Sequence, residues 1–326
     1  MKVRTLWQHE DGSAAVITAI AFTAILALCG LVIDLGAAYY QGSRVQNAAD
    51  AAAYAASTLL PIDVSDAEAL QTVRNTVAEY AQKNGMTAGS VDTVTLEDVV
   101  AGHYTSVYVQ LHHSVEYYFG KIMGLDSKVV AKSAKVRLEV ITSLSKMVPL
   151  GIEDSQFKQA MLTNNSQHVI VKYGGGDGTT GFFGALDLDG VKGGGAQDFA
   201  SWLAFGYNGV LNVNVNLPVE TGNMAGPTSC AFLQRYSSCT HYPSQGGCNA
   251  LYYEQNCSRV VYLIIFTMVD AHTIKIQGFA PFVLEGTNGN GEIVASHVTV
   301  HLQQGESQAV TEQNITYGVF RSRLVA

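Results

Sequence analysis

Basic residues are scarce in this 326-residue chain, and they never cluster. Lys and Arg number 19 against 27 Asp and Glu, which gives a formal net charge of −8. Proteins that bind nucleic acid neutralise its phosphates with concentrated positive charge, whereas the basic residues here are scattered singly. The sequence therefore excludes nucleic acid as a partner.

The motifs that mark common active sites are missing as well. No Ser stands in a GxSxG setting, and the Gly clusters at 174–176 and 193–195 match neither a GxxxxGK[ST] nor a GxGxxG phosphate loop, so turns are expected there. The segment 187–190, DLDG, lacks the later Glu that completes an EF-hand calcium loop. We predict no catalytic residue, no cofactor and no metal site, and we expect that the protein is not an enzyme.

Charge is absent altogether from Ala14 to Ile33. About twenty apolar residues, rising 1.5 Å each as a helix, match the ~30 Å hydrocarbon core of a bilayer, so residues 13–34 are predicted to form a transmembrane helix. Lys2 and Arg4 precede it, and Arg44 alone follows closely. By the positive-inside rule, residues 1–12 are cytoplasmic and the C-terminal region is extracytoplasmic in a single-pass protein of the cell membrane.

A cleaved signal peptide is the alternative interpretation of this segment. Residues 36–38, GAA, offer the small side chains that a signal peptidase reads. However, the apolar run exceeds the ~7 to 15 residues of a signal core, and a helical pattern continues after it. Retention is favoured, and cleavage stays open.

The residues after the span favour a helical extension over 35–61. This stretch is rich in Ala, which has the highest helix propensity, and Pro61 ends it. The extension is expected to continue the membrane helix as one rod. Small side chains at 48, 49, 52, 53, 55 and 56 leave a face that another helix can approach closely; a plain spacer is the alternative.

A family resemblance rests on these same residues. DGS at 11–13, the apolar run, DLG at 34–36, the Tyr pair at 39–40 and above all QNAADAAA at 46–53 resemble the N-terminal region of TadE/TadG-like proteins of Flp (Tad) pilus assembly. The resemblance covers about residues 9–60. Pilin-like members carry a Glu five residues after a Gly, but Ile17 stands there relative to Gly12. The chain is therefore similar to an uncleaved TadG-type component.

The resemblance implies a non-enzymatic, membrane-anchored component of a Tad/Flp-type pilus assembly or secretion system. Its partners would be the membrane and other pilus-assembly or envelope proteins, contacted through the N-terminal helix. The contact candidates on that helix are Gln46, Asn47 and Asp50. An extracytoplasmic adhesin or binding module, a pilin-like minor component on the cell surface, is the alternative function.

Two α+β units with mainly antiparallel sheets are expected beyond the helix. A small one over 62–146 has a helix at about 65–84 and alternating strand patterns, and a β-rich one over 147–326 has further strands and two helices. Strands of the first unit are predicted at 91–99, 104–115 and 128–142, with a short helix at 116–123. Those of the second are predicted at 167–173, 182–188, 210–219, 259–269, 272–284 and 291–302, with helices near 195–206 and after Pro227.

Four cysteines recur every nine residues within the turn-rich segment 227–258, namely Cys230, Cys239, Cys248 and Cys257. An oxidising compartment favours two disulfides among them, with three connectivities that the sequence does not separate. A zinc site is the competing interpretation, but structural zinc ligands usually come in closely spaced pairs such as CxxC, and none occurs. Free thiols are the third alternative.

Overall fold

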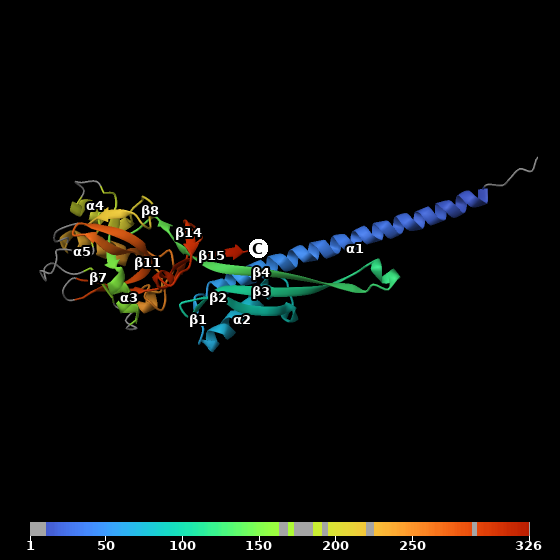
Figure 1. Ribbon diagram of the computed structural model, residues 1–326, viewed down its shortest axis with the longest axis horizontal. Coiled ribbons are helices and arrows are strands. Elements are labelled where there is room, and N and C mark those ends of the chain that lie inside the picture. Colours follow the sequence, from blue (N-terminus) through green and yellow to red (C-terminus); the bar gives the residue numbers. More distant parts are fainter. Residues whose placement is uncertain are drawn as a thin grey trace, which may run out of the picture.

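The computed structural model describes residues 11–162, 169–172, 185–190, 195–219, 225–288 and 292–325. A long helix projects from a body in which two sheets lie one after the other along the same axis (Figure 1). The α+β class with an N-terminal apolar helix and mainly antiparallel sheets is confirmed. The Gly cluster at 174–176 and the predicted strand residues 167–168, 173 and 182–184 lie outside the described residues.

Helix α1 (Asp11–Ser57) is a single helix of 47 residues, which corresponds to about 70 Å at 1.5 Å per residue. The predicted rod is confirmed. The helix continues without a break because no Pro occurs before position 61 and Ala dominates its second half. The chain leaves it through a turn at 58–60, immediately before Pro61.

The second half of α1 packs into the body. Helix α2 (Ala67–Lys83) lies against it, and Asp66 caps α2 by accepting a hydrogen bond from the Ala69 amide at 2.9 Å. The small side chains of α1 form the contact, because they let α2 and the sheet approach the helix backbone. Those that are fully buried are Ala48, Ala49, Ala52, Ala53 and Ala56.

The first sheet covers α1 and α2. Its main strands pair in the order β1–β3–β4–β15–β13, with β2 on β3 and β14 on β4. Alternate residues of β3, including Val107, Val109 and Leu111, are fully buried in the same core as the Ala face of α1, as period-two alternation predicts. The strands are β1 (Ile62–Asp63), β2 (Val91–Val100), β3 (His103–Glu116), β4 (Ser127–Ile141), β13 (Val300–His301), β14 (Ser307–Ala309) and β15 (Val319–Val325).

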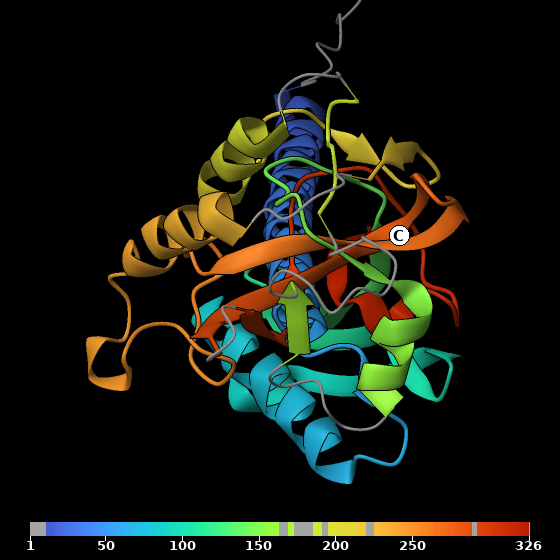
Figure 2. The same ribbon diagram turned by 90° about the vertical axis from the view of Figure 1, so that its left-hand side faces the viewer.

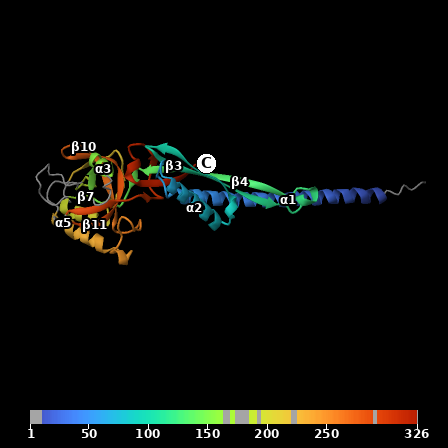
Figure 3. The ribbon, with the colours of Figure 1, turned by 90° about the horizontal axis from the view of Figure 1, so that it is seen from below.

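Strands β3 and β4 form a long hairpin that extends along α1 toward its N-terminus (Figures 1 and 3). Antiparallel pairing runs from Ser106↔Arg137 to Glu116↔Ser127. The tip, residues 117–126, holds a short 3-10 turn, η2 (Gly120–Met123), in place of the helix predicted at 116–123. Gly124, at φ 79°, ends that turn in the left-handed region.

The second sheet has the order β6–β10–β11–β12–β7, with β9 on β11, and β5 pairs separately with β8. Helices α4 and α5 pack against each other on one side of it, as the end-on view shows (Figure 2). Helix α3 follows β6 directly and is missing from the sequence prediction. The elements are β5 (Ser143–Leu144), β6 (Gly151–Glu153), α3 (Asp154–Leu162), β7 (Val169–Lys172), α4 (Gly195–Phe205), β8 (Leu211–Asn212), β9 (Asn216–Pro218), α5 (Ala225–Ser237), β10 (Val260–Asp270), β11 (Thr273–Thr287) and β12 (Ile293–His297).

The last strands return to the first sheet. β15 pairs antiparallel with β4 from Phe320↔Val140 to Val325↔Lys135, and β13 pairs parallel with β15. The end of α1 is joined to this strand, because the Tyr54 hydroxyl donates to the Ser322 carbonyl oxygen at 2.7 Å and the Ser57 hydroxyl donates to that of Ser322 at 2.7 Å. Sheet pairing thus crosses the boundary predicted between residues 146 and 147, and the domain limits stay predictions.

Candidate functional sites

The first half of α1 is uncovered. From residue 14 to residue 33 every residue except Gly30 is exposed, although most are large and apolar. By length and composition, this helix is able to cross a membrane. Tyr39 and Tyr40, 81% and 62% exposed, follow the run at the level where amphipathic rings form interfacial belts.

Asp34 connects the end of this apolar run to the hairpin tip. Its side chain is buried, and its two carboxylate oxygens accept hydrogen bonds from three consecutive backbone amides: Tyr118 at 2.7 Å, Phe119 at 3.0 Å and Gly120 at 2.6 Å. A buried carboxylate is stable only when such donors replace water. The residue therefore holds the tip on α1.

Gly30 lets the tip approach the helix closely. A Cβ atom at this position would lie 2.7 Å from the Cβ atom of Phe119, so a larger residue forces the two elements apart. The Asp34 and Gly30 contacts together place the hairpin tip beside the last turn of the apolar run. Its most exposed apolar side chains are Ile122 at 84%, Met123 at 80% and Tyr118 at 72%, and the charged Lys121 and Asp126 are exposed as well.

The predicted partner contacts on α1 differ in their surroundings. The Gln46 amide donates to Asp50 at 2.8 Å and to the Ser133 carbonyl oxygen of β4 at 2.9 Å, so both side chains serve contacts within the chain. Asn47 is exposed. That these residues contact a partner protein stays a prediction.

Three of the four evenly spaced cysteines converge with a histidine. Ligand atoms of Cys239, His241, Cys248 and Cys257 all lie within 4.8 Å of one another. Cys248 and Cys257 are buried, Cys239 is half-buried, and His241 is at the surface. We call these four residues the Cys3His cluster; three thiols and one imidazole are a ligand set that tetrahedral zinc accepts.

Backbone amides point at the sulfur atoms of the cluster. The Cys248 amide donates to Cys239 Sγ at 3.4 Å, and the Arg259 amide donates to Cys257 Sγ at 3.4 Å. Burial raises the pKa of the Cys239 thiol, but the Cys248 amide and the neighbouring thiols outweigh it and hold that pKa at about 6. Burial raises the pKa of Cys248 to about 12.

The two predicted disulfides are not formed in the structure. All five cysteines of the chain lie in its described part and are free thiols. Cys230 is exposed on α5, outside the cluster, so it has no partner among the converging three. His241 was not predicted as a member of this group, because it belongs to no CxxC pair; the available signal was its C-x-H spacing from Cys239.

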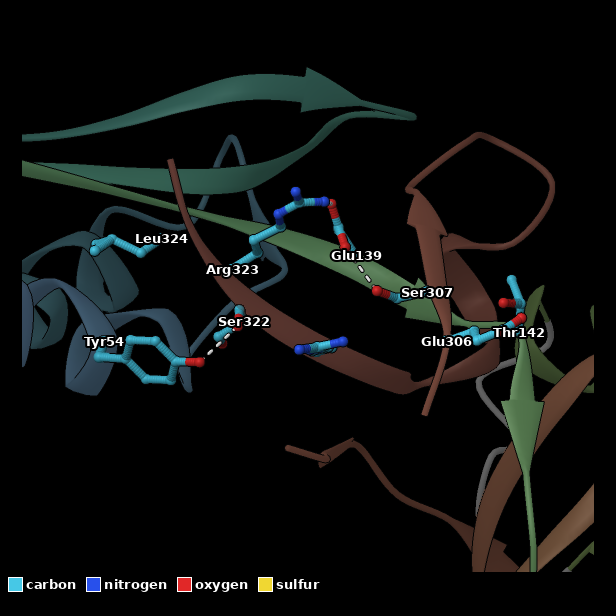
Figure 4. Close-up of a pocket in the computed structure, with 9 residues that line it drawn as sticks. Tyr54, Glu139, Thr142, Glu306, Ser307, Ser322, Arg323 and Leu324 are labelled. Atoms are coloured by element: carbon cyan, nitrogen blue, oxygen red, sulfur yellow. Dashed lines mark hydrogen bonds and ion pairs between the residues drawn. The ribbon is translucent and has the colours of Figure 1, made fainter. Parts of the chain in front are cut away.

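A polar hollow of about 650 Å³ lies between α1, β4, β14 and β15 (Figure 4). At its wall Glu139 is 4% exposed, accepts a hydrogen bond from Ser307 at 2.6 Å and pairs with Arg323 at 3.1 Å and Arg137 at 3.3 Å. Burial raises the pKa of Glu139, but these three donors outweigh it and hold that pKa below its usual value. The saturated contacts indicate a structural role.

Comparison with known proteins bears on the N-terminal part of the chain. No curated protein and no solved structure matches this chain. A family model described as putative Flp pilus-assembly TadE/G-like matches residues 12–69, which comprise nearly all of α1 and the start of α2. The resemblance predicted from the QNAAD pattern is thereby confirmed over residues 12–69, which are similar to the TadE/G-like proteins of Flp pilus assembly.

Proposed function

We propose that this protein is a non-enzymatic, membrane-anchored component of a Tad/Flp-type pilus assembly or secretion system. Residues 1–12 would lie in the cytoplasm and both sheets on the outer side of the cell membrane. The observation that carries the proposal is the overlap between the family match at 12–69 and a helix that is uncovered and apolar from residue 14 to 33.

The build of α1 supports a role in positioning. The helix has no break between its apolar half and its buried half, so the body cannot swing freely about the span. Contacts at both ends of the second half of α1 reinforce this: Asp34 holds the hairpin tip, and Tyr54 and Ser57 bond to Ser322 of β15. Such an anchor would present the body at a fixed height above the membrane.

The surface available to partner proteins on α1 is the face turned away from the sheet. Asn47 is exposed there, and Tyr39 and Tyr40 are exposed about two turns earlier. The Ala face, by contrast, is filled by α2 and the sheet of the same chain. We expect pilus-assembly partners to contact α1 around Asn47.

Deletion of the gene tests the function. We expect a deletion strain to lose surface pili, counted by electron microscopy, and the full chain to restore them. A second chain, in which residues 14–33 are replaced by an unrelated single-pass span, separates simple anchoring from specific contacts within the membrane. Normal numbers of pili in the deletion strain would overturn the proposal.

Site-specific crosslinking tests the contact surface. A photo-crosslinking residue at Asn47 is expected to capture another pilus-assembly protein in intact cells. The matched control is Gln71, which is exposed on α2. Equal capture from both positions, or capture from Gln71 alone, would move the contact away from α1.

A further inference from the structure

We propose that the Cys3His cluster is a structural zinc site. Zinc at a tetrahedral site takes thiolate sulfur at about 2.3 Å and imidazole nitrogen at about 2.0 Å, which corresponds to ligand atoms roughly 3.5 to 3.8 Å apart. The four ligand atoms already lie within 4.8 Å of one another, so small side-chain rotations close the tetrahedron.

The loop that carries the ligands depends on a cross-link. Between α5 and β10 the only regular element is the single turn η3 (Pro243–Gln245). Gly246 and Gly247 then reverse the chain at φ 76° and 106°, which returns Cys248 to Cys239. A loop with so few apolar residues needs a disulfide or a metal to stay folded.

The surroundings match the charge of an occupied site. Three thiolates and one dication sum to −1, and Arg259 supplies a buried cation next to Cys257. Its guanidinium donates to the Cys248 carbonyl oxygen at 3.1 Å and stacks on the Tyr236 ring at 3.7 Å, so it is held in place. The backbone amides that donate to the sulfur atoms of Cys239 and Cys257 also stabilise the negative charge of thiolates.

Zinc satisfies this ligand set better than a disulfide. Any disulfide among three converging thiols leaves the third sulfur and the imidazole without a partner, whereas one tetrahedral ion engages all four groups. Thiolate and imidazole ligands also disfavour magnesium and calcium, which prefer oxygen. The proposal goes beyond the proposed role in pilus assembly and does not depend on it.

Metal analysis of the full chain tests the site. The protein is purified in detergent without a polyhistidine tag or chelator, and zinc is measured by mass spectrometry. We expect about one zinc ion per chain, and less than about a tenth of that in His241→Ala. Cys230→Ser, which removes the exposed thiol outside the cluster, should keep its zinc. His241→Cys should also keep it, because thiolate replaces imidazole.

Three results would overturn the proposal. The first is a full chain without zinc, and the second is a disulfide between any two of Cys239, Cys248 and Cys257 in non-reduced peptides. His241 is at the surface, so its variant tests the ligand without disturbing the buried core. The third result is zinc retained equally in His241→Ala and Cys230→Ser, which would mark an adventitious ion only.

A second inference concerns the hairpin tip. We infer that residues 117–126 lie in the interfacial layer of the same membrane that α1 crosses, which rests on the proposed anchoring. Phe119 contacts Gly30, three residues before the apolar run ends at Ile33, so the tip lies roughly 4.5 Å below that end. Ile122, Met123 and Leu125 are exposed at 84%, 80% and 56%.

The tip comes close to the main requirement for contact with lipid, because most of its backbone amides are hydrogen-bonded within the protein. Asp34 accepts from three of its amides, and the amides of Ile122, Gly124 and Leu125 donate to carbonyl oxygens within the tip. Lys121 pairs with Glu116 at 2.8 Å, where a long side chain can reach the polar layer. An apolar surface continuous with the membrane span is most simply covered by lipid.

Quenching by brominated lipids tests the tip. The full chain is reconstituted in vesicles, and tryptophan is introduced as Ile122→Trp or, as a control at the far end of the hairpin's sheet, as Val64→Trp. We expect most of the added fluorescence of Ile122→Trp to be lost with brominated lipid and that of Val64→Trp to remain. An unquenched Ile122→Trp in a chain that co-floats with vesicles overturns this inference alone; a chain that fails to co-float overturns the anchoring.

Discussion

His297 shows how one buried residue links stability to pH. It is packed edge-on against Phe157 and Phe282 at centroid distances of 5.3 and 5.4 Å, and its Nε2 donates to the Tyr317 carbonyl oxygen at 3.0 Å. Burial lowers the pKa of His297, and the bond to Tyr317 offsets this only in part. The unfolded chain therefore takes up this proton first as the pH falls.

This difference gives a prediction. The free energy of unfolding should decline as the pH falls below about 6.5, because the unfolded state then binds more protons than the folded state. His297→Gln keeps a donor but cannot titrate, so its unfolding free energy should change less between pH 7 and pH 5. Denaturant unfolding at several pH values measures it. His272→Gln, at an exposed position, is the control; an unchanged slope in His297→Gln would contradict the assignment.

Glu139 loses its charge on protonation, whereas His297 gains one, but the contribution of Glu139 to stability is also lost as the pH falls. Its pKa is lowered in the folded chain, so its contribution is present above the unfolded value of about 4.3 and is lost as the pH falls through the folded value. Glu139→Gln should lower the free energy of unfolding by about 1 to 3 kcal/mol at pH 7.

The cost of Glu139→Gln should begin to shrink as the pH drops below about 4 and should vanish only below the lowered pKa of folded Glu139, where both chains carry a neutral group. Glu306→Gln is the matched control, since Glu306 borders the same hollow but is exposed; it should change stability by less than about 0.5 kcal/mol. A similar loss in both variants would show that the ion pairs of Glu139 contribute nothing specific.

At the scale of the element, α1 is one helix with two environments. Apart from Gly30, which lies against Phe119, its apolar half is exposed in the described chain, and its Ala-rich half is buried by α2, β3 and β4. The small side chains that predicted a partner helix are used by α2 of the same chain. Asp34 lies between the two halves and joins the hairpin to the helix.

Removal of that carboxylate should release the hairpin tip. In Asp34→Ala the three amides lose their acceptor, and cleavage by trypsin after Lys121 should accelerate roughly tenfold or more in detergent because local opening becomes easier. Asp66→Ala removes the same kind of helix–amide contact at α2 and serves as the control. Asp66→Ala should lower overall stability without faster cleavage after Lys121. An unaltered cleavage rate in Asp34→Ala would mean that the packing of Phe119 on Gly30 is sufficient to hold the tip on α1.

At the scale of the whole molecule, the C-terminus completes a sheet begun near the N-terminus. β15 lies between β4 and β13, and Ser322 bonds to the end of α1. The second sheet is therefore inserted between two parts of the first. The chain thus passes from the first sheet into the second and then returns to the first.

Truncation after Gly318 should consequently weaken the first sheet. Hydrogen exchange is expected to accelerate at residues 135–140 of β4, which pair with β15, because those strand groups lose their partner. Residues 127–134 of β4 pair with β3 alone and act as an internal control. Unchanged exchange over 135–140 would mean that β15 is a dispensable edge.

Local patterns determined much of this architecture. The charge-free run, the Ala-rich continuation and Pro61 were sufficient for α1, and period-two alternation was sufficient for β3 and β4, because each depends on neighbours in sequence. The QNAAD pattern likewise predicted the family match of residues 12–69. Short elements such as β14 and α3 escaped, since they hold few residues and are fixed by distant contacts.

Only the tertiary structure decided which groups meet. Nothing local brings Asp34 to the amides of Tyr118–Gly120, or Ser57 to Ser322, because the pairing depends on how the hairpin and β15 pack on α1. The same holds for the cysteines: equal spacing predicted pairs, but the fold of the loop gathers Cys239, Cys248 and Cys257 with His241 and leaves Cys230 apart. The local sequence determines which cysteine and histidine side chains the loop carries, and the reversal of the chain within the loop determines how close together they lie.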